Sequence, residues 1–368
     1  MTSRSLPAQI YGFLLLGFVA VATTLGGVLT FVGNPDPLAN EKRRLAQLEV
    51  PRDLAQWGQF PKKFDVFFGD NFGFRQALIR LDSKIALALL GRSPSDNVLL
   101  GRDKWLYFAG EHSIELYQNA LPLSEGDLDL MRQRIAGRRD RLAARGIGYA
   151  FAIAPDKHTI YPEFMPRRIL RKQKPSQYSQ VLEMAKAADL PVVDLRSALL
   201  AAKPTGQLYL RDDTHWNDLG VSVALPTLFA AMRPKIDLSA PPLSPDDFEM
   251  KPIKTGDLAE MALISRDENA PVLKKSRLPC AFEVTEKNWD SAGRRFFTRT
   301  HCPSARKKLL FIHDSFGQAL APRLAAEFGD MVAVWVHPTD AEFDALVERE
   351  KPDFVLEERA ERYLSSHP

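Results

Sequence analysis

Two short segments of this chain carry side chains that can together perform nucleophilic chemistry. Asp213 and His215 are two positions apart, so in an extended stretch both leave the same face and the carboxylate can orient the imidazole. Ser315 follows the hydrophobic run 309–312 and precedes an Ala- and Leu-containing stretch that is typical of a helix. A strand-to-helix turn of this kind exposes the hydroxyl and directs N–H groups toward developing negative charge. The pattern predicts a serine nucleophile, a histidine base and an orienting aspartate.

Other interpretations of the same residues stay open at this point. Ser315 also suits the N-cap position of a helix. Asp212 is a second carboxylate that can orient His215, although in an extended stretch its side chain points to the opposite face. A divalent metal site is the alternative for the acidic cluster, because carboxylates and imidazole bind such ions readily. Its ligands would be Asp212, Asp213, His215 and Asp218.

The order and surroundings of the two motifs resemble a known family, the AlgJ/AlgX-type polysaccharide O-acetyltransferases. This is an SGNH hydrolase-like group in which the Asp-x-His motif precedes the serine motif. Further segments that fit the family are 41–46, 70–75, 101–107, 154–157, 256–259 and 351–364. One position departs from it: the family usually has a small residue two positions before the nucleophile, where this chain has His313. His313 is a structural residue or a competing base.

The resemblance implies an enzyme with a serine mechanism. It implies a three-layer α/β/α SGNH hydrolase-like domain and O-acetyl transfer to a secreted, alginate-like polysaccharide through an acetyl-serine at Ser315. The expected partners are the polysaccharide acceptor, a membrane-bound acyltransferase that supplies acetyl groups, and the bacterial inner membrane, with the catalytic domain in the periplasm. No cofactor or metal is expected. A carbohydrate acetylesterase of the same fold and a non-catalytic polysaccharide-binding protein are the alternatives.

Three further residues are predicted to contact the polysaccharide. Trp216 adjoins the base and can stack on a sugar ring, or it is a core tryptophan. Lys157 can bind an anionic sugar or an acyl oxygen, or it is a solvated loop lysine. Arg323, in the helix predicted after Phe316, is the third.

The elements that must position these residues alternate along the chain. Strands are predicted at 148–154, 191–195, 309–312, 332–336 and 353–356, and helices at 128–145, 176–189, 218–232, after Phe316 and at 341–350. This order indicates a mostly parallel sheet wrapped by helices. Ligands of such folds gather at the carboxyl ends of the strands, and the predicted site residues follow shortly after strands.

The chain is expected to have three parts. Residues 12–32 contain no charged side chain over about the length of a membrane-spanning helix, so residues 1–33 are predicted to be a retained anchor, with a secretion signal as the alternative. Residues 34–120 are predicted to pack on the main domain and include an amphipathic helix at 74–90 that ends at Gly91. Residues 121–368 are predicted to form the catalytic domain, with an insertion at about 234–304 beside the active site.

Composition and cysteine content limit the functional classes. The 368 residues are 45% hydrophobic and 26% charged, which suits one or two folded domains. The 49 basic and 46 acidic residues are well mixed, which gives nucleic-acid binding no support. Cys280 and Cys302 are the only cysteines and suit a disulfide better than a zinc site, as in a compartment outside the cytoplasm.

Overall fold

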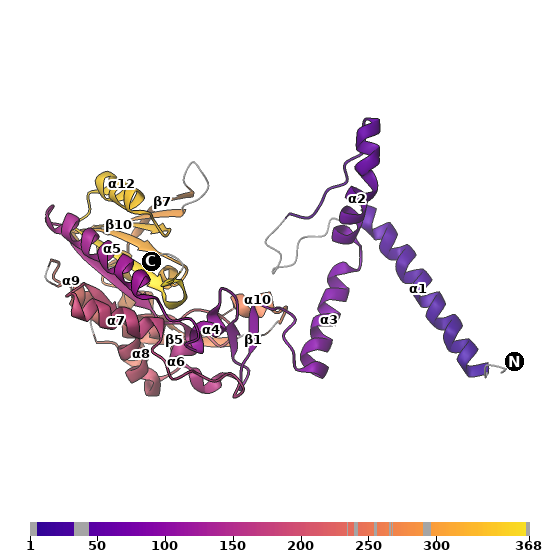
Figure 1. Ribbon diagram of the computed structural model, residues 1–368, viewed down its shortest axis with the longest axis horizontal. Coiled ribbons are helices and arrows are strands. Elements are labelled where there is room, and N and C mark those ends of the chain that lie inside the picture. The colour runs from indigo at the N-terminus through magenta and orange to yellow at the C-terminus, as the bar shows by residue number, and fades with distance from the viewer. Residues whose placement is uncertain are drawn as a thin grey trace. The chain divides into compact units, whose positions relative to one another are not determined.

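The computed structural model describes residues 6–32, 44–233, 235–238, 242–253, 256–264, 266, 268–289 and 296–365. Contacts divide the chain into two units, residues 1–95 with 260–264 and residues 96–259 with 265–368. Figure 1 draws the elements of both units. The second unit begins at residue 96, inside the segment 34–120 that was predicted to precede the catalytic domain, and residues 34–43 of that segment lie outside the described residues.

The first unit is helical. Its helices are α1 (Leu6–Val32), α2 (Leu54–Asn71) and α3 (Arg75–Leu90). Asp53 caps α2 by accepting a hydrogen bond from the Gln56 N–H at 2.8 Å. Gly91 ends α3 in the left-handed conformation with φ 57°, so the predicted glycine cap is confirmed. The predicted anchor is not confirmed, because within the described ranges no helix is long and apolar enough to cross a membrane.

The second unit is built on a seven-stranded sheet with strand order β4-β3-β11-β9-β10-β8-β7. The parallel strands are β3 (Gly148–Ala154), β4 (Val192–Asp194), β9 (Lys308–His313), β10 (Asp330–Trp335) and β11 (Phe354–Ala360). The antiparallel strands are β8 (Phe296–His301), which pairs with β10, and β7 (Glu283–Trp289). The sheet is therefore mixed, because the end of the predicted insertion 234–304 extends it.

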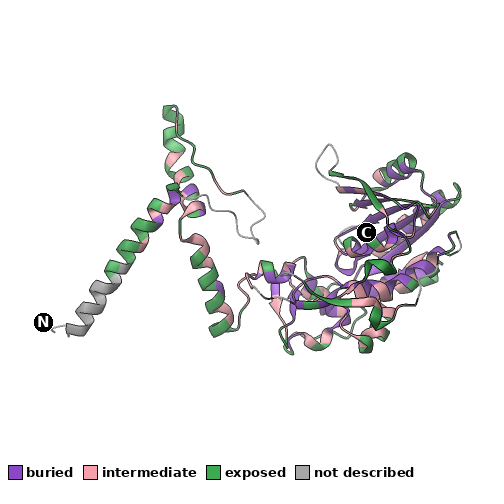
Figure 2. Ribbon diagram, turned by 180° about the vertical axis from the view of Figure 1, so that it is seen from behind, coloured by how far each residue is buried: buried purple, intermediate pink, exposed green. Residues whose placement is uncertain are grey.

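Helices cover both faces of this sheet, as the three-layer prediction requires (Figure 1). The helices packed on one face are α5 (Glu125–Ala143), α7 (Gln177–Ala187) and α12 (Asp340–Glu350). Those packed on the other are α8 (Arg196–Ala202), α9 (Asp218–Met232) and α11 (Gly317–Ala325). Side chains of β9 alternate between the two cores, with Leu309 and Phe311 in one and Leu310 and Ile312 in the other. The central strands are accordingly buried along their length (Figure 2).

Shorter elements surround the carboxyl end of the sheet. Two antiparallel pairs are formed by β1 (Val98–Leu100) with β2 (Leu106–Phe108) and by β5 (Phe248–Ile253) with β6 (Glu268–Leu273). The short helices are α4 (Ser113–Tyr117), α6 (Lys157–Ile160) and α10 (Asp257–Met261). The helix α6 directly follows β3, which places Lys157 at the edge of the sheet where ligands gather.

Cys280 and Cys302 form the predicted disulfide. The bond joins the segment before β7 to the residue after β8, and both cysteines pack against Ala326, directly after α11. The crosslink thereby fixes the edge of the sheet that the insertion adds.

Loss of this disulfide is expected to lower the free energy of unfolding by about 3 kcal/mol, because the crosslink removes loop entropy from the unfolded chain. The bond spans a sequence separation of 22. Urea unfolding of the oxidised protein and of the Cys280→Ser, Cys302→Ser double variant measures the difference. Equal unfolding free energies would contradict the expectation.

Candidate active site

The loop that carries Asp213 and His215 is closed by an antiparallel bridge between Tyr209 and Trp216. His215 Nδ1 lies 2.7 Å from Asp213 Oδ1, and the same oxygen accepts the His215 backbone N–H at 2.9 Å. The carboxylate therefore holds the proton on Nδ1 and leaves Nε2 as the basic nitrogen. The two predicted side chains are brought together as the spacing required.

The environment keeps Asp213 ionised. Burial raises the pKa of this carboxyl, but the hydrogen bond and charge of His215, together with backbone N–H donors, act more strongly and lower the pKa to about 2. An ionised carboxylate can stabilise the imidazolium that forms when Nε2 takes up a proton.

A second carboxylate, Asp257 of α10, borders the pair and was not singled out from the sequence. Its Oδ2 lies 3.9 Å from His215 Nδ1, and its backbone N–H donates to Asp213 Oδ2 at 3.0 Å. Its Oδ1 accepts the Thr214 N–H at 2.7 Å. Asp257 thus holds the loop in place through hydrogen bonds from α10. The family-like segment 256–259 was the sequence signal that could have identified it.

Lys157 holds the same loop from the end of β3. Its Nζ donates to the carbonyl oxygens of Leu210, Arg211 and Asp213 at 3.1, 3.0 and 2.6 Å, and the residue is 3% exposed. An ammonium group has three donors, so none is left for a sugar or an acyl oxygen, in contrast to the predicted substrate contact. Burial lowers the pKa of Lys157 to about 8, although nearby carboxylates, Asp213 first among them, oppose this shift.

The four ligands of the alternative metal site are not assembled. Asp212 forms an ion pair with Arg266, which also removes it as an orienter of His215. Asp218 Oδ2 accepts the Leu273 N–H at 2.9 Å. Both carboxylates therefore have partners elsewhere.

A different group, Asp213, His215 and Asp257, does place its ligand atoms within 4.8 Å of one another. Its His215 Nδ1 is already occupied by the hydrogen bond to Asp213. The arrangement suits an orienting carboxylate better than a metal ligand set.

Ser315 lies in the turn between β9 and α11, as predicted, and is partly buried. The residue at the N-cap of α11 is Phe316, with no side-chain capping bond, so Ser315 does not have the alternative N-cap role. The Phe316 ring packs edge-on against His215 with ring centroids 4.9 Å apart. The backbone carbonyl oxygen of Phe316 accepts the Trp216 Nε1–H at 3.1 Å. These contacts bring the serine turn against the histidine loop.

The basic nitrogen of His215 has no partner of its own. Nε2 is buried and, in the part of the chain that the structure describes, makes no hydrogen bond. A buried polar atom without a hydrogen bond costs free energy until a hydroxyl or a ligand forms one with it. Ser315, next to the Phe316 ring that covers this imidazole, is the nearby hydroxyl of the predicted triad.

Buried carboxyl groups fix the serine turn. Asp314 accepts the N–H of Phe316 at 2.9 Å and of Ala360 at 2.7 Å, and its own N–H donates to Glu358 at 3.3 Å. Burial raises the pKa of both Asp314 and Glu358. Among the described residues none accepts a hydrogen bond from the Ser315 N–H, which leaves this donor for an oxyanion.

His313 has the contacts of a structural histidine. It is buried, its Nδ1 lies 2.6 Å from the Asp314 carbonyl oxygen, and its ring stacks on Phe311 at 4.7 Å. Burial lowers its pKa. A Cβ added at Gly317 would lie 2.4 Å from the His313 Cβ, so the glycine of the serine motif makes room for this histidine.

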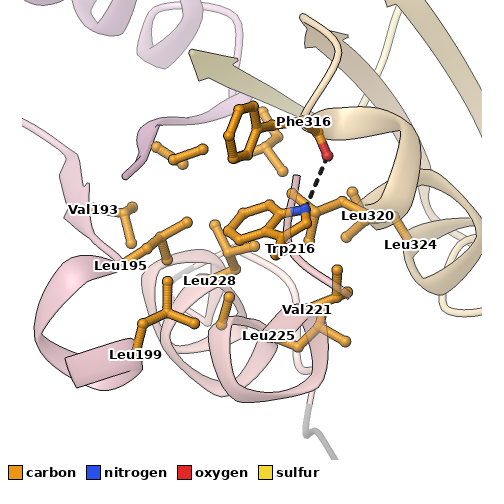
Figure 3. Close-up of a cluster of buried hydrophobic side chains, with 14 of the residues drawn as sticks. Val193, Leu195, Leu199, Trp216, Val221, Leu225, Leu228, Phe316, Leu320 and Leu324 are labelled. Atoms are coloured by element: carbon orange, nitrogen blue, oxygen red, sulfur yellow. Dashed lines mark hydrogen bonds between the residues drawn. The ribbon is translucent and has the colours of Figure 1, made fainter. Parts of the chain in front are cut away.

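Trp216 belongs to the core and does not offer a face to a sugar. It is 2% exposed, and Figure 3 shows its ring among aliphatic side chains of α9 and α11, with the hydrogen bond to Phe316. Its bulk and its Nε1–H instead connect the histidine loop to the serine turn.

Arg323 remains a candidate for substrate contact. It is partly buried on α11, donates to Ser222 Oγ at 2.9 Å, and lines a cavity of about 450 Å³ together with Asp218 and Lys275. Burial lowers its pKa, so the cation is incompletely compensated by its surroundings.

A serine at a strand-to-helix turn, next to a phenylalanine that contacts an Asp-x-His loop at the carboxyl edge of an α/β sheet, is the arrangement expected of an SGNH hydrolase-like protein. The chain belongs to the family described as SGNH hydrolase-like domain, acetyltransferase AlgX, whose model matches residues 98–348. The family expected from the motifs is confirmed.

Two similar proteins are named as alginate O-acetylases. Probable alginate O-acetylase AlgJ of Pseudomonas syringae pv. tomato is 30% identical over 54% of this chain and 48% of its own length. Its namesake in Pseudomonas putida is 33% identical over 37% and 34%. The chain therefore spans at most about half the length of these relatives.

Solved structures were matched over most of their length. The O-acetyltransferase domain of Pseudomonas putida AlgJ matches with a TM-score of 0.46 and 23% identity, over 73% of this chain and 92% of that one. Bacillus cereus PatB1 matches with a TM-score of 0.47 and 15% identity, over 73% and 97%.

Gly256→Ala is expected to damage the histidine loop. A Cβ at Gly256 would lie 2.5 Å from the Asp212 carbonyl oxygen and 2.6 Å from the Asp213 Cβ. Such overpacking should lower the free energy of unfolding by about 1–3 kcal/mol and displace the Asp213 carboxylate. The control is Gly126→Ala in α5, where the nearest atom is Ser124 Oγ at 3.7 Å and stability should not fall. Equal free energies of unfolding for the two variants, measured in urea, would contradict the close packing of Gly256 against the histidine loop.

The buried ammonium of Lys157 predicts a pH-dependent stability difference. Its pKa falls from 10.5 to about 8 on folding, so between these values the unfolded chain binds more protons than the folded one. Wild type should therefore gain stability relative to Lys157→Met as pH rises through this window, by up to about 3 kcal/mol. Urea unfolding of both proteins across the window measures the gain. A difference that does not change with pH would contradict the lowered pKa.

Proposed function

We propose that this protein is an O-acetyltransferase that uses Ser315, His215 and Asp213 to move acetyl groups onto a secreted polysaccharide. The observation that carries the proposal is the state of His215. Its Nδ1 is fixed by Asp213 at 2.7 Å, whereas its buried Nε2 makes no hydrogen bond with the described residues. That is the arrangement a general base needs before it engages a serine hydroxyl.

In the first half of the reaction, Ser315 Oγ attacks the carbonyl carbon of an acetyl ester while His215 Nε2 takes the hydroxyl proton. The oxyanion of the tetrahedral intermediate accepts a hydrogen bond from the Ser315 N–H. The carbon–oxygen bond to the leaving group then breaks, and the imidazolium returns the proton to that group. The product is acetyl-Ser315.

In the second half, a sugar hydroxyl takes the place of the leaving group. His215 Nε2 removes its proton, the sugar oxygen attacks acetyl-Ser315, and the serine oxygen leaves with the proton from the imidazolium. Transfer exceeds hydrolysis only when the sugar is held at a high effective concentration beside the ester. The chemistry is otherwise identical to that of an esterase.

The acceptor, donor and location are part of the same proposal. The relatives are named alginate O-acetylases, so the acceptor proposed for this chain is an alginate-like polysaccharide, with Arg323 contacting it. A membrane-bound acyltransferase at the bacterial inner membrane is the partner that supplies the acetyl groups. The disulfide between Cys280 and Cys302 supports a periplasmic location, because such bonds persist in oxidising compartments.

Removing either triad partner should abolish turnover. Ser315→Ala and His215→Ala are each expected to lower hydrolysis of a small acetyl ester by at least about 10³-fold, and the double variant should lose little more, because triad members act as one unit. Circular dichroism confirms that the variants are folded. Wild-type rates in Ser315→Ala would contradict the proposed mechanism.

A product assay separates transferase from esterase. The full chain is incubated with a small acetyl ester and a panel of acidic and neutral oligosaccharides. The masses of the oligosaccharides are then measured by mass spectrometry. Acetylated oligosaccharide formed by wild type and absent with Ser315→Ala supports transfer. Rapid ester hydrolysis with no acetylated product across the panel would favour the esterase.

A further inference from the structure

A cavity of about 330 Å³ adjoins the turn that carries Ser315. Its walls come from α11 on one side and from β7, β8 and β10 on the other. His313 and Gln318, two residues before and three residues after Ser315, both line it. We call this space the aromatic cavity because Phe282, Phe296 and Trp335 also line it.

Trp335 lines the aromatic cavity and is exposed, unlike the buried Trp216. Trp335 ends β10 and is the register partner of His313 on β9, so both side chains lie on the α11 face of the sheet. Their rings stack with centroids 6.4 Å apart, and Trp335 is 38% exposed. A tryptophan ring with an accessible face suits the apolar face of a sugar ring.

Thr300 supplies the cavity with an unsatisfied polar group. The residue is 4% exposed, and its Oγ1 makes no hydrogen bond within the described ranges. Leaving a buried hydroxyl unpaired costs about 1–3 kcal/mol, so an ordered water or a ligand is expected to pair with it. A sugar hydroxyl is such a partner.

The charges around the cavity favour an acidic sugar. Lys287 lines it, and the neighbouring cavity that contains Arg323 and Lys275 shares Phe282 and Pro322 with it. Among the described residues, neither Lys287 nor Arg323 is in an ion pair. Asp218 is the acidic residue among those lining the two cavities, so the cations exceed the carboxylate.

We propose that the aromatic cavity is the acceptor site and binds an acidic sugar residue of the polysaccharide. The sugar ring lies on Trp335, one hydroxyl pairs with Thr300 Oγ1, and the carboxylate faces Lys287 and Arg323. A mostly apolar cavity with a few placed polar groups is the usual form of a small-ligand site. The assignment rests on the proposed function only in naming this sugar as the acetyl acceptor, because binding itself requires no acyl transfer.

Isothermal titration of the full chain, in a Ser315→Ala background, tests the site with an oligouronate and a neutral oligosaccharide of equal length. The parent should bind the oligouronate more tightly, and Trp335→Leu should weaken that binding at least about tenfold. Thr300→Val should weaken it several-fold without lowering the free energy of unfolding, since no protein hydrogen bond is lost. Trp57→Leu, which removes another exposed tryptophan, should bind as the parent does.

Several outcomes would overturn the inference. These are parental affinity in Trp335→Leu, equal losses in Trp335→Leu and Trp57→Leu, equal affinity of the parent for both oligosaccharides, and no binding by the parent. The two proposals fail separately. Trp335-dependent binding without acetylated product refutes the transferase alone, whereas acetylated product with Trp335-independent binding refutes the aromatic cavity alone.

Discussion

The hydrogen bond between Asp213 and His215 is the interaction on which the rest of the site depends. At 2.7 Å it sets the tautomer of the imidazole and thereby decides which nitrogen can act as a base. Three groups from other elements keep the loop in place: the Lys157 ammonium on its carbonyls, the Asp257 N–H on the second carboxylate oxygen, and the Phe316 ring against the imidazole. The position of the pair is therefore supported from three other segments of the domain.

The site is held together by groups that are individually unfavourable for folding. Lys157, Asp314 and Glu358 are almost fully buried. Burial lowers the pKa of Lys157 and raises the pKa of Asp314 and Glu358, which favours the neutral form of each group. His215 Nε2 and Thr300 Oγ1 are buried without partners in the described residues. The cores on both faces of the sheet offset these terms, as expected around a candidate functional site.

Features set by local sequence could be predicted, and features set by distant neighbours could not. The strand at 148–154 is a fully buried hydrophobic run, and the helix at 218–232 starts after Asn217, whose side chain caps it. By contrast, residues 283–288 of β7 are exposed and mostly polar, so this sequence does not show that it extends the main sheet. Trp216 and Trp335 differ in exposure only because of what the fold packs against each. Lys157 likewise was a plausible ligand contact until three loop carbonyls were brought to it.

We propose that Ser315 is a nucleophile activated by His215 and Asp213. Reaction of the full chain with a small sulfonyl fluoride, followed by intact mass and peptide mapping, tests it most directly because the reagent reports nucleophilicity without any substrate. We expect a single adduct on Ser315, formed much more slowly in Asp213→Asn and not at all in His215→Ala. An unmodified protein, or an adduct on another residue at the same rate in all variants, would contradict it.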